Sequence, residues 1–240
     1  MIEWWVGLGP AKRVLLIAVL TPLGIVALLL FTSAVEGAAE SRKPPLPFRS
    51  ALSDGTSTLR AWDDDVGRGR FIDGGYELLV KERGRTVSGV PNTQRATHQH
   101  VEVTVVFRRS DNQTSDSQPS VGLICRSLEN GFYDFRLRVD GRFAIYRRNR
   151  NEDYRELASS TAMGLPRLPT DGAIRLAAEC AGFNPTELRF FVNGSAVLTA
   201  EDHSAMIDKG DAGFLIGSGA DRDFAVLFTD YLLRDLEVRP

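Results

Sequence analysis

The chain has 240 residues, enough for one large β-sandwich or two small domains whose core needs neither disulfides nor metals for stability. Its 29 lysines and arginines nearly balance its 31 aspartates and glutamates, so it lacks the basic surplus of a nucleic-acid-binding protein. Two cysteines are too few for a disulfide-rich scaffold, and their surroundings lack the cysteine or histidine partners of a zinc site.

An uncharged, strongly apolar run occupies residues 14–31 and directly follows Lys12 and Arg13. As a helix, this run would be about 27 Å long, close to the ~30 Å hydrocarbon core of a bilayer. Because basic residues favour the cytoplasmic side, we expect residues 1–13 in the cytoplasm and all residues after 31 outside it. The sequence therefore predicts a retained signal-anchor helix in the lipid bilayer and a single-pass protein of the cell membrane.

A cleaved signal peptide is the alternative interpretation of the same run. Small residues that a peptidase could recognise follow it at Ser33-Ala34 and at residues 37–39. The run is longer than the ~7–15 apolar residues usual for a signal peptide, which favours the anchor. Both interpretations export the rest of the chain, and cleavage would make the protein secreted.

A proline-rich segment separates the apolar run from the rest of the chain. Residues 32–47 include Pro44, Pro45 and Pro47, and prolines favour extended polyproline geometry. We expect this segment to be a semi-rigid linker between the membrane and a folded domain of residues 48–240.

The apolar pattern of this domain has a period of two residues, which indicates β-strands. The alternation is clearest over residues 101–108, 133–140, 174–180 and 188–192. Asp140-Gly141 and Asn193-Gly194 are the residue pairs that favour two-residue β-hairpin turns. The sequence predicts an all-β fold in which two antiparallel sheets pack as a sandwich.

The order of the strand segments carries a family resemblance. The segments read FIDGGYELLV, VEVTVVF, VGLICRS, GFYDFRLRVDGRFAIYR, IRLAAEC, ELRFFVNG, GDAGFLIGS and FTDYLLRDLEV. In this order they resemble the concanavalin A-like (laminin-G-like) jelly-roll domains of bacterial extracytoplasmic proteins, of the type shared with the 3-keto-disaccharide hydrolase-like family. The resemblance covers roughly residues 48–238. It implies the fold, but that fold carries lectins, glycosidases, adhesion modules and structural spacers alike.

Polar side chains on the outward phase of the strands form a candidate ligand-binding face. In the domains that the sequence resembles, sugars bind on the concave sheet face, and arginine and carboxylate groups suit hydroxyls and anionic groups. An outer sheet face is polar in any case, so a merely solvated face is the alternative. If the meander strands form one sheet, its solvent-facing side carries Glu102, Arg126, Asp134, Arg136, Arg138 and Tyr146, and Arg175, Glu179 and Arg189 could join from neighbouring strands.

Three aromatic residues could stack on a sugar ring. These are Tyr146, Tyr154 and Phe183, which do not share the apolar phase of the core-facing positions. Packing against the protein itself is the alternative for all three.

No catalytic residues are assigned from the sequence. Jelly-roll glucanases carry the motif E-x-D-x-x-E on one strand, and this motif is absent. Glu102, Asp134 and Glu179 could converge only through the fold. His98, His100 and His203 lie in polar segments where we expect them to be exposed, and the chain has no G-x-S-x-G nucleophile elbow.

No cofactor and no metal ligands are predicted. Binding of one structural calcium ion is the alternative. Acidic runs occur at residues 63–65, 111–116, 151–153 and 221–223, but none has EF-hand spacing.

We expect a disulfide between Cys125 and Cys180. Export places both thiols where disulfides persist, and each cysteine shares its strand phase with apolar residues that would face the core. The bridge requires neighbouring strands, or facing positions of the two sheets. Two separate buried thiols are the alternative.

These observations predict a membrane-anchored, extracytoplasmic β-sandwich that binds carbohydrate or a partner protein at the cell envelope without catalysis. An accessory subunit of a membrane protein complex is one alternative. A glycan-processing hydrolase of the keto-disaccharide hydrolase type is the other.

Overall fold

The computed structural model describes residues 43–53, 58–72, 74–107, 119–149, 154–161, 172–204, 207–219 and 223–236. The chain divides into residues 1–43 and 44–240, and all described strands belong to the second unit. The predicted cytoplasmic start, the apolar run of residues 14–31 and most of the linker lie outside the described residues. Within the described ranges there is no helix long and apolar enough to cross a membrane.

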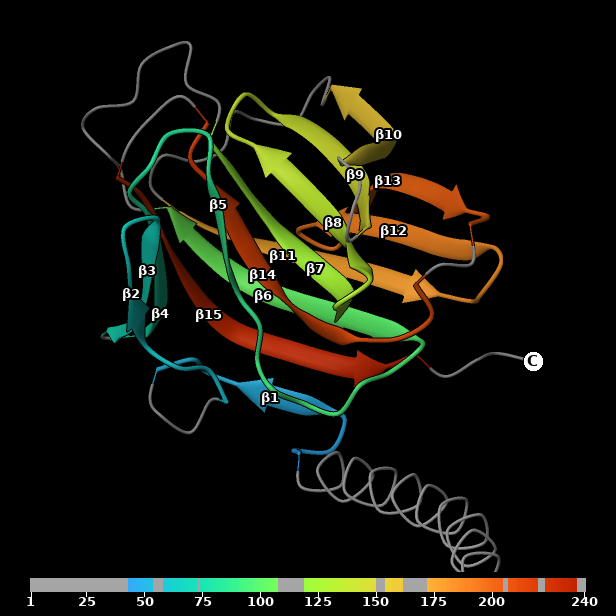
Figure 1. The fold of residues 1–240 in the computed structure, drawn as a ribbon, viewed down its shortest axis with the longest axis horizontal. Coiled ribbons are helices and arrows are strands. Elements are labelled where there is room, and N and C mark those ends of the chain that lie inside the picture. Colours follow the sequence, from blue (N-terminus) through green and yellow to red (C-terminus); the bar gives the residue numbers. More distant parts are fainter. Residues whose placement is uncertain are drawn as a thin grey trace, which may run out of the picture. The chain divides into compact units, whose positions relative to one another are not determined.

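Two antiparallel sheets form the two layers of the fold (Figure 1). The larger sheet has the order β13 (Ser195–Asp202), β12 (Thr186–Val192), β11 (Ala173–Ala181), β6 (Gln99–Phe107), β15 (Phe224–Asp235), β4 (Gly75–Val80), β3 (Gly67–Ile72) and β2 (Trp62–Asp63), with β1 (Phe48–Ser50) paired to β15. The smaller sheet has the order β10 (Arg155–Thr161), β9 (Arg142–Asn149), β8 (Gly131–Arg138), β7 (Ser120–Leu128), β14 (Asp211–Gly217) and β5 (Thr86–Gly89). The predicted all-β, two-sheet architecture is confirmed.

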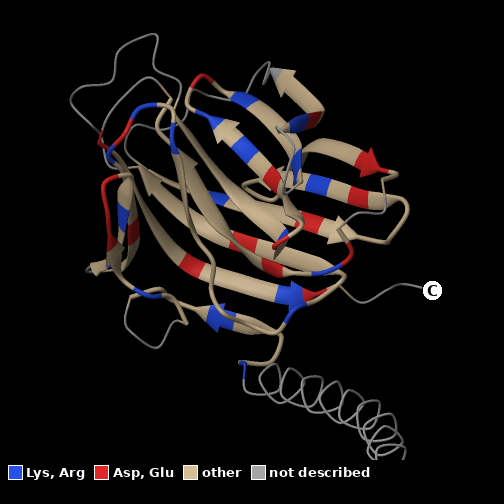
Figure 2. Cartoon of the chain, in the orientation of Figure 1, with Lys and Arg blue, Asp and Glu red and all other residues tan. Residues whose placement is uncertain are grey.

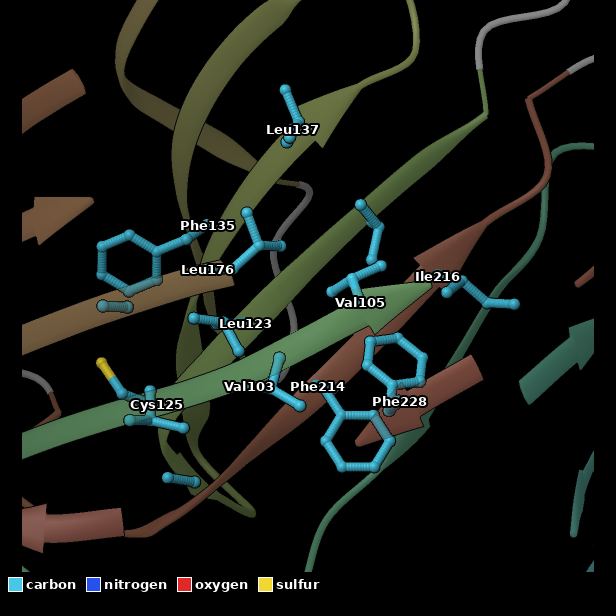
Figure 3. Packing of buried hydrophobic residues seen from close by; sticks show 14 of the residues in the cluster. Val103, Val105, Leu123, Cys125, Phe135, Leu137, Leu176, Phe214, Ile216 and Phe228 are labelled. Carbon is cyan, nitrogen blue, oxygen red and sulfur yellow. The ribbon is translucent and has the colours of Figure 1, made fainter. Parts of the chain in front are cut away.

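The core lies between the sheets and follows from the alternation in the sequence. Val103 and Val105 of β6 are fully buried, as is Phe135 of β8 on the opposite sheet. Figure 3 shows such side chains from both sheets converging on one interior. Phe214 of β14 and Phe228 of β15 stack across the interface, with ring centroids 4.2 Å apart. Burying one face of each strand is what holds the two layers together.

The hairpin turns form where the Asp-Gly and Asn-Gly pairs predict them. Gly141 has a φ of 85° between β8 and β9, and its backbone nitrogen donates to the carbonyl of Arg138 at 2.9 Å. Asn193 and Gly194 have φ values of 50° and 81° between β12 and β13. Asn193-Gly194 thus has positive φ at both residues, whereas in Asp140-Gly141 only the glycine has it.

A disulfide joins the two sheets, as predicted. Cys125 of β7 and Cys180 of β11 are bonded, with their Cα atoms 6.6 Å apart. Both residues are fully buried, and their strands belong to opposite sheets. The prediction that both sulfurs point into one interior is therefore confirmed.

A buried ion pair provides a second link between the sheets. Asp202, at the end of β13, accepts a hydrogen bond from Arg147 of β9 at 2.8 Å and from the hydroxyl of Tyr133 of β8 at 2.9 Å. Ser204 donates to the same carboxylate at 2.7 Å. Burial raises the pKa of Tyr133 to about 12, so its hydroxyl stays a donor. The interior at this end of the sandwich is thus polar and hydrogen-bonded.

Candidate functional site

The six predicted ligand-binding residues do not share one face. Glu102 lies on β6 of the larger sheet, whereas Asp134, Arg136, Arg138 and Tyr146 lie on β8 and β9 of the smaller sheet. The expectation of a single sheet is wrong because β6 and β7, although consecutive in the chain, belong to different layers.

Arg126 is a buried structural residue and not part of an outer face. The register of β7 shifts between Cys125 and Leu128, and Arg126 has a φ of 54°, so its side chain departs from the strand alternation and is fully buried. Its guanidinium donates at 2.6–3.0 Å to the carbonyls of Thr97, Ile207 and Gly182 and to the hydroxyl of Thr186. These acceptors are all neutral oxygens. The guanidinium therefore links parts of the chain that are far apart in the sequence. The prediction of a solvent-facing Arg126 is wrong.

The remaining candidates lie on neighbouring strands of the smaller sheet. Arg136 donates to Asp134 at 2.8 Å, and its guanidinium lies 4.9 Å from the ring centre of Tyr154 and 5.8 Å from that of Tyr146. Asp134 is fully buried, and this burial raises its pKa, an effect that the guanidinium of Arg136 opposes. Arg138 pairs with Asp140 at 3.1 Å. Asp134 and Arg136 are thus committed to each other, whereas Arg138 and Tyr146 also line a hollow of about 240 Å³.

The outer face of the larger sheet carries a row of charged side chains that runs across four strands. The register places Arg234 of β15 opposite His100 of β6, His100 opposite Glu179 of β11, and Glu179 opposite Arg189 of β12. Nδ1 of His100 lies 3.0 Å from the carboxylate of Glu179. Figure 2 shows acidic and basic residues alternating on these strands. Cross-strand neighbours of opposite charge stabilise such a face modestly.

His100 also approaches a second carboxylate. Its Nε2 lies 3.6 Å from Glu102, which accepts a hydrogen bond from Nε of Arg175 at 2.6 Å. The exposed fractions of the Glu102 and Glu179 side chains are 15% and 18%, and that of His100 is 11%. The expectation of an exposed His100 is wrong, since the ring lies between two carboxylates. His100 precedes Glu102 by two residues and so lies on the same side of β6. This spacing is the signal in the sequence that could have placed His100 beside Glu102.

Hollows flank the charged row because β11 presents small side chains beside it. Ala181 lines a hollow of about 1120 Å³, and Ala177 lines another of about 490 Å³. Glu179 borders both hollows, and a third of about 300 Å³ adjoins the second at Glu102 and Arg175. We call these three adjoining hollows the sheet groove. Its polar lining includes His98, His100, Glu102, Arg175, Glu179, Glu187, Arg189 and Arg234.

The groove brings together residues that can bind hydroxyl groups. Carboxylates accept hydrogen bonds from hydroxyls, and guanidinium groups donate to them in a planar fork. The sequence identified Glu102, Arg175, Glu179 and Arg189 as outward-facing, and the structure places all four here. In the part of the chain that the structure describes, no group of three or more His, Cys, Asp or Glu residues is placed to hold a metal ion. The acidic runs at 111–116 and 151–153 lie outside the described residues.

No protein-family model matches the sequence, and no curated protein matches it either. Solved structures do match in fold. The carbohydrate-binding module CBM66 from Bacillus subtilis has a TM-score of 0.55 at 11% identity, covering 75% of this chain and 96% of that one. A Bacillus subtilis protein of unknown function with a galectin-like fold has a TM-score of 0.57 at 11% identity, covering 81% and 97%.

The β-glucanase of Bacillus licheniformis matches with a TM-score of 0.55 at 8% identity, covering 79% of this chain and 98% of that one. At these identities the likeness shows the fold alone. The chain therefore has the concanavalin A-like jelly-roll fold that its sequence resembles.

Proposed function

We propose that this protein is a membrane-anchored, extracytoplasmic module that binds carbohydrate in the sheet groove without cleaving it. The observation that carries the proposal is the set of adjoining hollows on one sheet face, each lined by carboxylate and guanidinium groups.

The dimensions and chemistry of the groove support a carbohydrate as its ligand. Small-molecule sites have volumes of about 300–1,000 Å³. Two of the hollows, of about 490 and 300 Å³, have volumes in this range, and the third, of about 1120 Å³, is slightly larger. Because the hollows adjoin one another, they suit a ligand of several linked units. The lining alternates acceptors such as Glu179 with donors such as Arg189, which matches the donor and acceptor character of sugar hydroxyls.

The fold adds support by analogy. One of the similar structures is named a carbohydrate-binding module and another a β-glucanase. Such an analogy raises the expectation of a glycan ligand but does not identify it. Anchoring rests on the apolar run of residues 14–31 and its basic flank.

The test is binding of defined glycans to the purified full-length protein. The probes are cellohexaose, laminarihexaose, chitohexaose and an alginate hexasaccharide, measured by isothermal titration calorimetry and followed by a glycan array. We expect at least one probe to bind, and the double change Glu179→Gln with Arg189→Ser to weaken it more than about tenfold, since both residues line the groove.

Arg138→Ser is the matched control, because Arg138 lies on the outer face of the smaller sheet and we expect it to leave binding unchanged. Absence of binding across the probes and the array would refute the proposal. Equal loss in the control and the groove variant would place binding elsewhere.

A glycan-cleaving enzyme is the second candidate, and the cluster of His100, Glu102 and Glu179 favours it. One imidazole approaches both carboxylates, so these are close enough for the roughly 5–9.5 Å spacing of glycosidase pairs. Here one carboxyl would protonate the leaving oxygen and the other would act as base or nucleophile. Product release from the same four oligosaccharides, lost in both Glu102→Gln and Glu179→Gln, would establish this activity in place of binding alone.

A further inference from the structure

A short turn at the rim of the sheet groove carries an exposed aromatic ring. Residues 182–185 connect β11 to β12, and Phe183 in this turn is 52% exposed. Phe183 and Tyr154 are the exposed large hydrophobic side chains of the described residues. The ring of Tyr154 already lies against the guanidinium groups of Arg136 and Arg148 on the smaller sheet, at 4.9 and 5.3 Å.

The turn borders the largest hollow of the groove. Gly182, which directly precedes Phe183, lines this hollow together with Ala181 and His98. Arg189 and Arg234 line it as well. Phe183 therefore directly follows two residues of the cavity wall in the chain, although its own side chain is not among the groups that line the cavity.

The turn is held in place by a buried cation. The carbonyl of Gly182 accepts a hydrogen bond from Arg126 at 2.6 Å, and its backbone nitrogen donates to Nδ1 of His98 at 3.2 Å. The guanidinium of Arg126 is itself fixed by the carbonyls of Thr97 and Ile207. A guanidinium removed from water has to be hydrogen-bonded on all sides, so these contacts leave the turn little freedom.

Resting on the function proposed above, we infer that Phe183 is an aromatic platform that stacks on one pyranose ring of a glycan that extends from the largest hollow past the turn of residues 182–185. A pyranose presents a face of C–H groups, which packs on an aromatic ring, and hydroxyls at its edge. The arginines and carboxylates of the hollow would bind those hydroxyls. Because the backbone of the turn is already held, binding orders the Phe183 side chain but not the turn.

The test compares three variants of the full-length protein, with the hexasaccharide that binds the unaltered protein best as the probe. Phe183→Ala is expected to weaken binding about tenfold or more, because it removes the stacking surface. Phe183→Trp is expected to bind within about threefold of the unaltered protein. Its tryptophan emission, after subtraction of the emission of the three native tryptophans measured in the unaltered protein with the same probe, should shift saturably over the same probe concentrations. Tyr154→Ala, which removes the exposed aromatic on the other sheet, should bind normally.

The thermal midpoint of each variant checks that it is folded. Unchanged binding by folded Phe183→Ala, together with loss in the Glu179 and Arg189 double variant, would overturn the platform and leave the proposed function intact. No binding by the unaltered protein to any of the four oligosaccharides or to the array would overturn both. If the tryptophan emission of Phe183→Trp does not change when the probe binds, this result would also contradict the proposed role of Phe183.

Discussion

Arg126 shows what a single residue contributes at the end of the sandwich. Its side chain bonds to backbone carbonyls on three segments that are far apart in the sequence, at Thr97, Gly182 and Ile207. Its own backbone nitrogen donates to the side chain of Gln99 at 2.8 Å, and Gln99 in turn donates to the carbonyl of Gly210. Of the acceptors of the Arg126 side chain, Ile207 and Thr186 are buried, and Thr97 and Gly182 are half-buried.

Replacing Arg126 with methionine should therefore destabilise the fold strongly. The change keeps much of the side-chain volume but leaves several buried acceptors unpaired, each costing ~1–3 kcal/mol. We expect the free energy of unfolding to fall by about 3 kcal/mol or more in urea denaturation. Arg138→Ser is the control, because its surface pair with Asp140 contributes ~1 kcal/mol at most. Comparable losses in the two variants would contradict the structural role of Arg126.

Asp202 makes part of the stability depend on pH. Burial by itself raises the pKa of this carboxyl, but the hydrogen bonds from Ser204, Tyr133 and Arg147 outweigh burial and hold the pKa below its ordinary value of 3.8. Between the lowered pKa and 3.8 the unfolded chain binds more protons than the folded chain, so stability rises with pH across this window. Above the window the contribution is complete.

Asp202→Asn should remove this dependence. We expect the variant to be less stable than the unaltered protein at neutral pH, because Arg147 loses its charged partner. The difference should shrink as pH falls from 3.8 to below the lowered pKa, where the carboxylate is protonated in the folded protein as well. Urea unfolding at neutral and strongly acidic pH measures both values, and a difference that stays constant with pH would argue against the assignment.

At this scale, strand alternation was a reliable guide wherever the backbone is regular. It identified the core positions of β6, such as Val101 and Val103, and the outward positions Glu102 and Glu179. It failed at Arg126 because a local register shift changes which side the residue faces, and no residue in the sequence marks that shift. The burial of His100 could not be predicted without knowing that β11 pairs with β6.

Among the elements, β7 and β11 are the pair that the disulfide joins across the interior. The bond between Cys125 and Cys180 closes a loop with a sequence separation of 55 residues. Loops of this length lose much conformational entropy when they are closed in the unfolded chain.

Replacing both cysteines with alanine should lower the free energy of unfolding by about 4 kcal/mol on the chain-entropy model. Urea unfolding of the oxidised protein, the reduced protein and the double variant measures the effect. Mass spectrometry after alkylation without reductant checks the bond itself. Labelling of both cysteines in folded, oxidised protein would show that the thiols are free.

Turn chemistry predicted the hairpins, but no local signal in the sequence predicted which strands belong to which sheet. Asn193-Gly194 specifies its turn through positive φ at both residues and Asp140-Gly141 through positive φ at the glycine, and both are properties of a residue pair. The assignment of β6 and β7 to different layers depends on which apolar faces pack together across the whole domain. This is why Glu102 was grouped with β8 residues that lie on the other sheet.

For the whole molecule, the remaining prediction concerns its place in the cell. If residues 14–31 are a retained anchor, the full-length protein should stay in the membrane fraction after high-salt and carbonate washing. Protease added from outside should cleave within residues 48–240. Sequencing of the purified protein is the decisive control, because an N-terminus between Ser33 and Glu40 would indicate a cleaved signal peptide.

The position of β15 has a consequence for how the protein is made. This strand is the last one described in chain order, yet it lies within the larger sheet and pairs with β1, β4 and β6 (Figure 1). During synthesis, β4 and β6 emerge long before their shared neighbour and keep open edges until residues 224–235 arrive. Such unpaired edges are prone to aggregation, and any chain that stops short of β15 leaves the larger sheet divided in two.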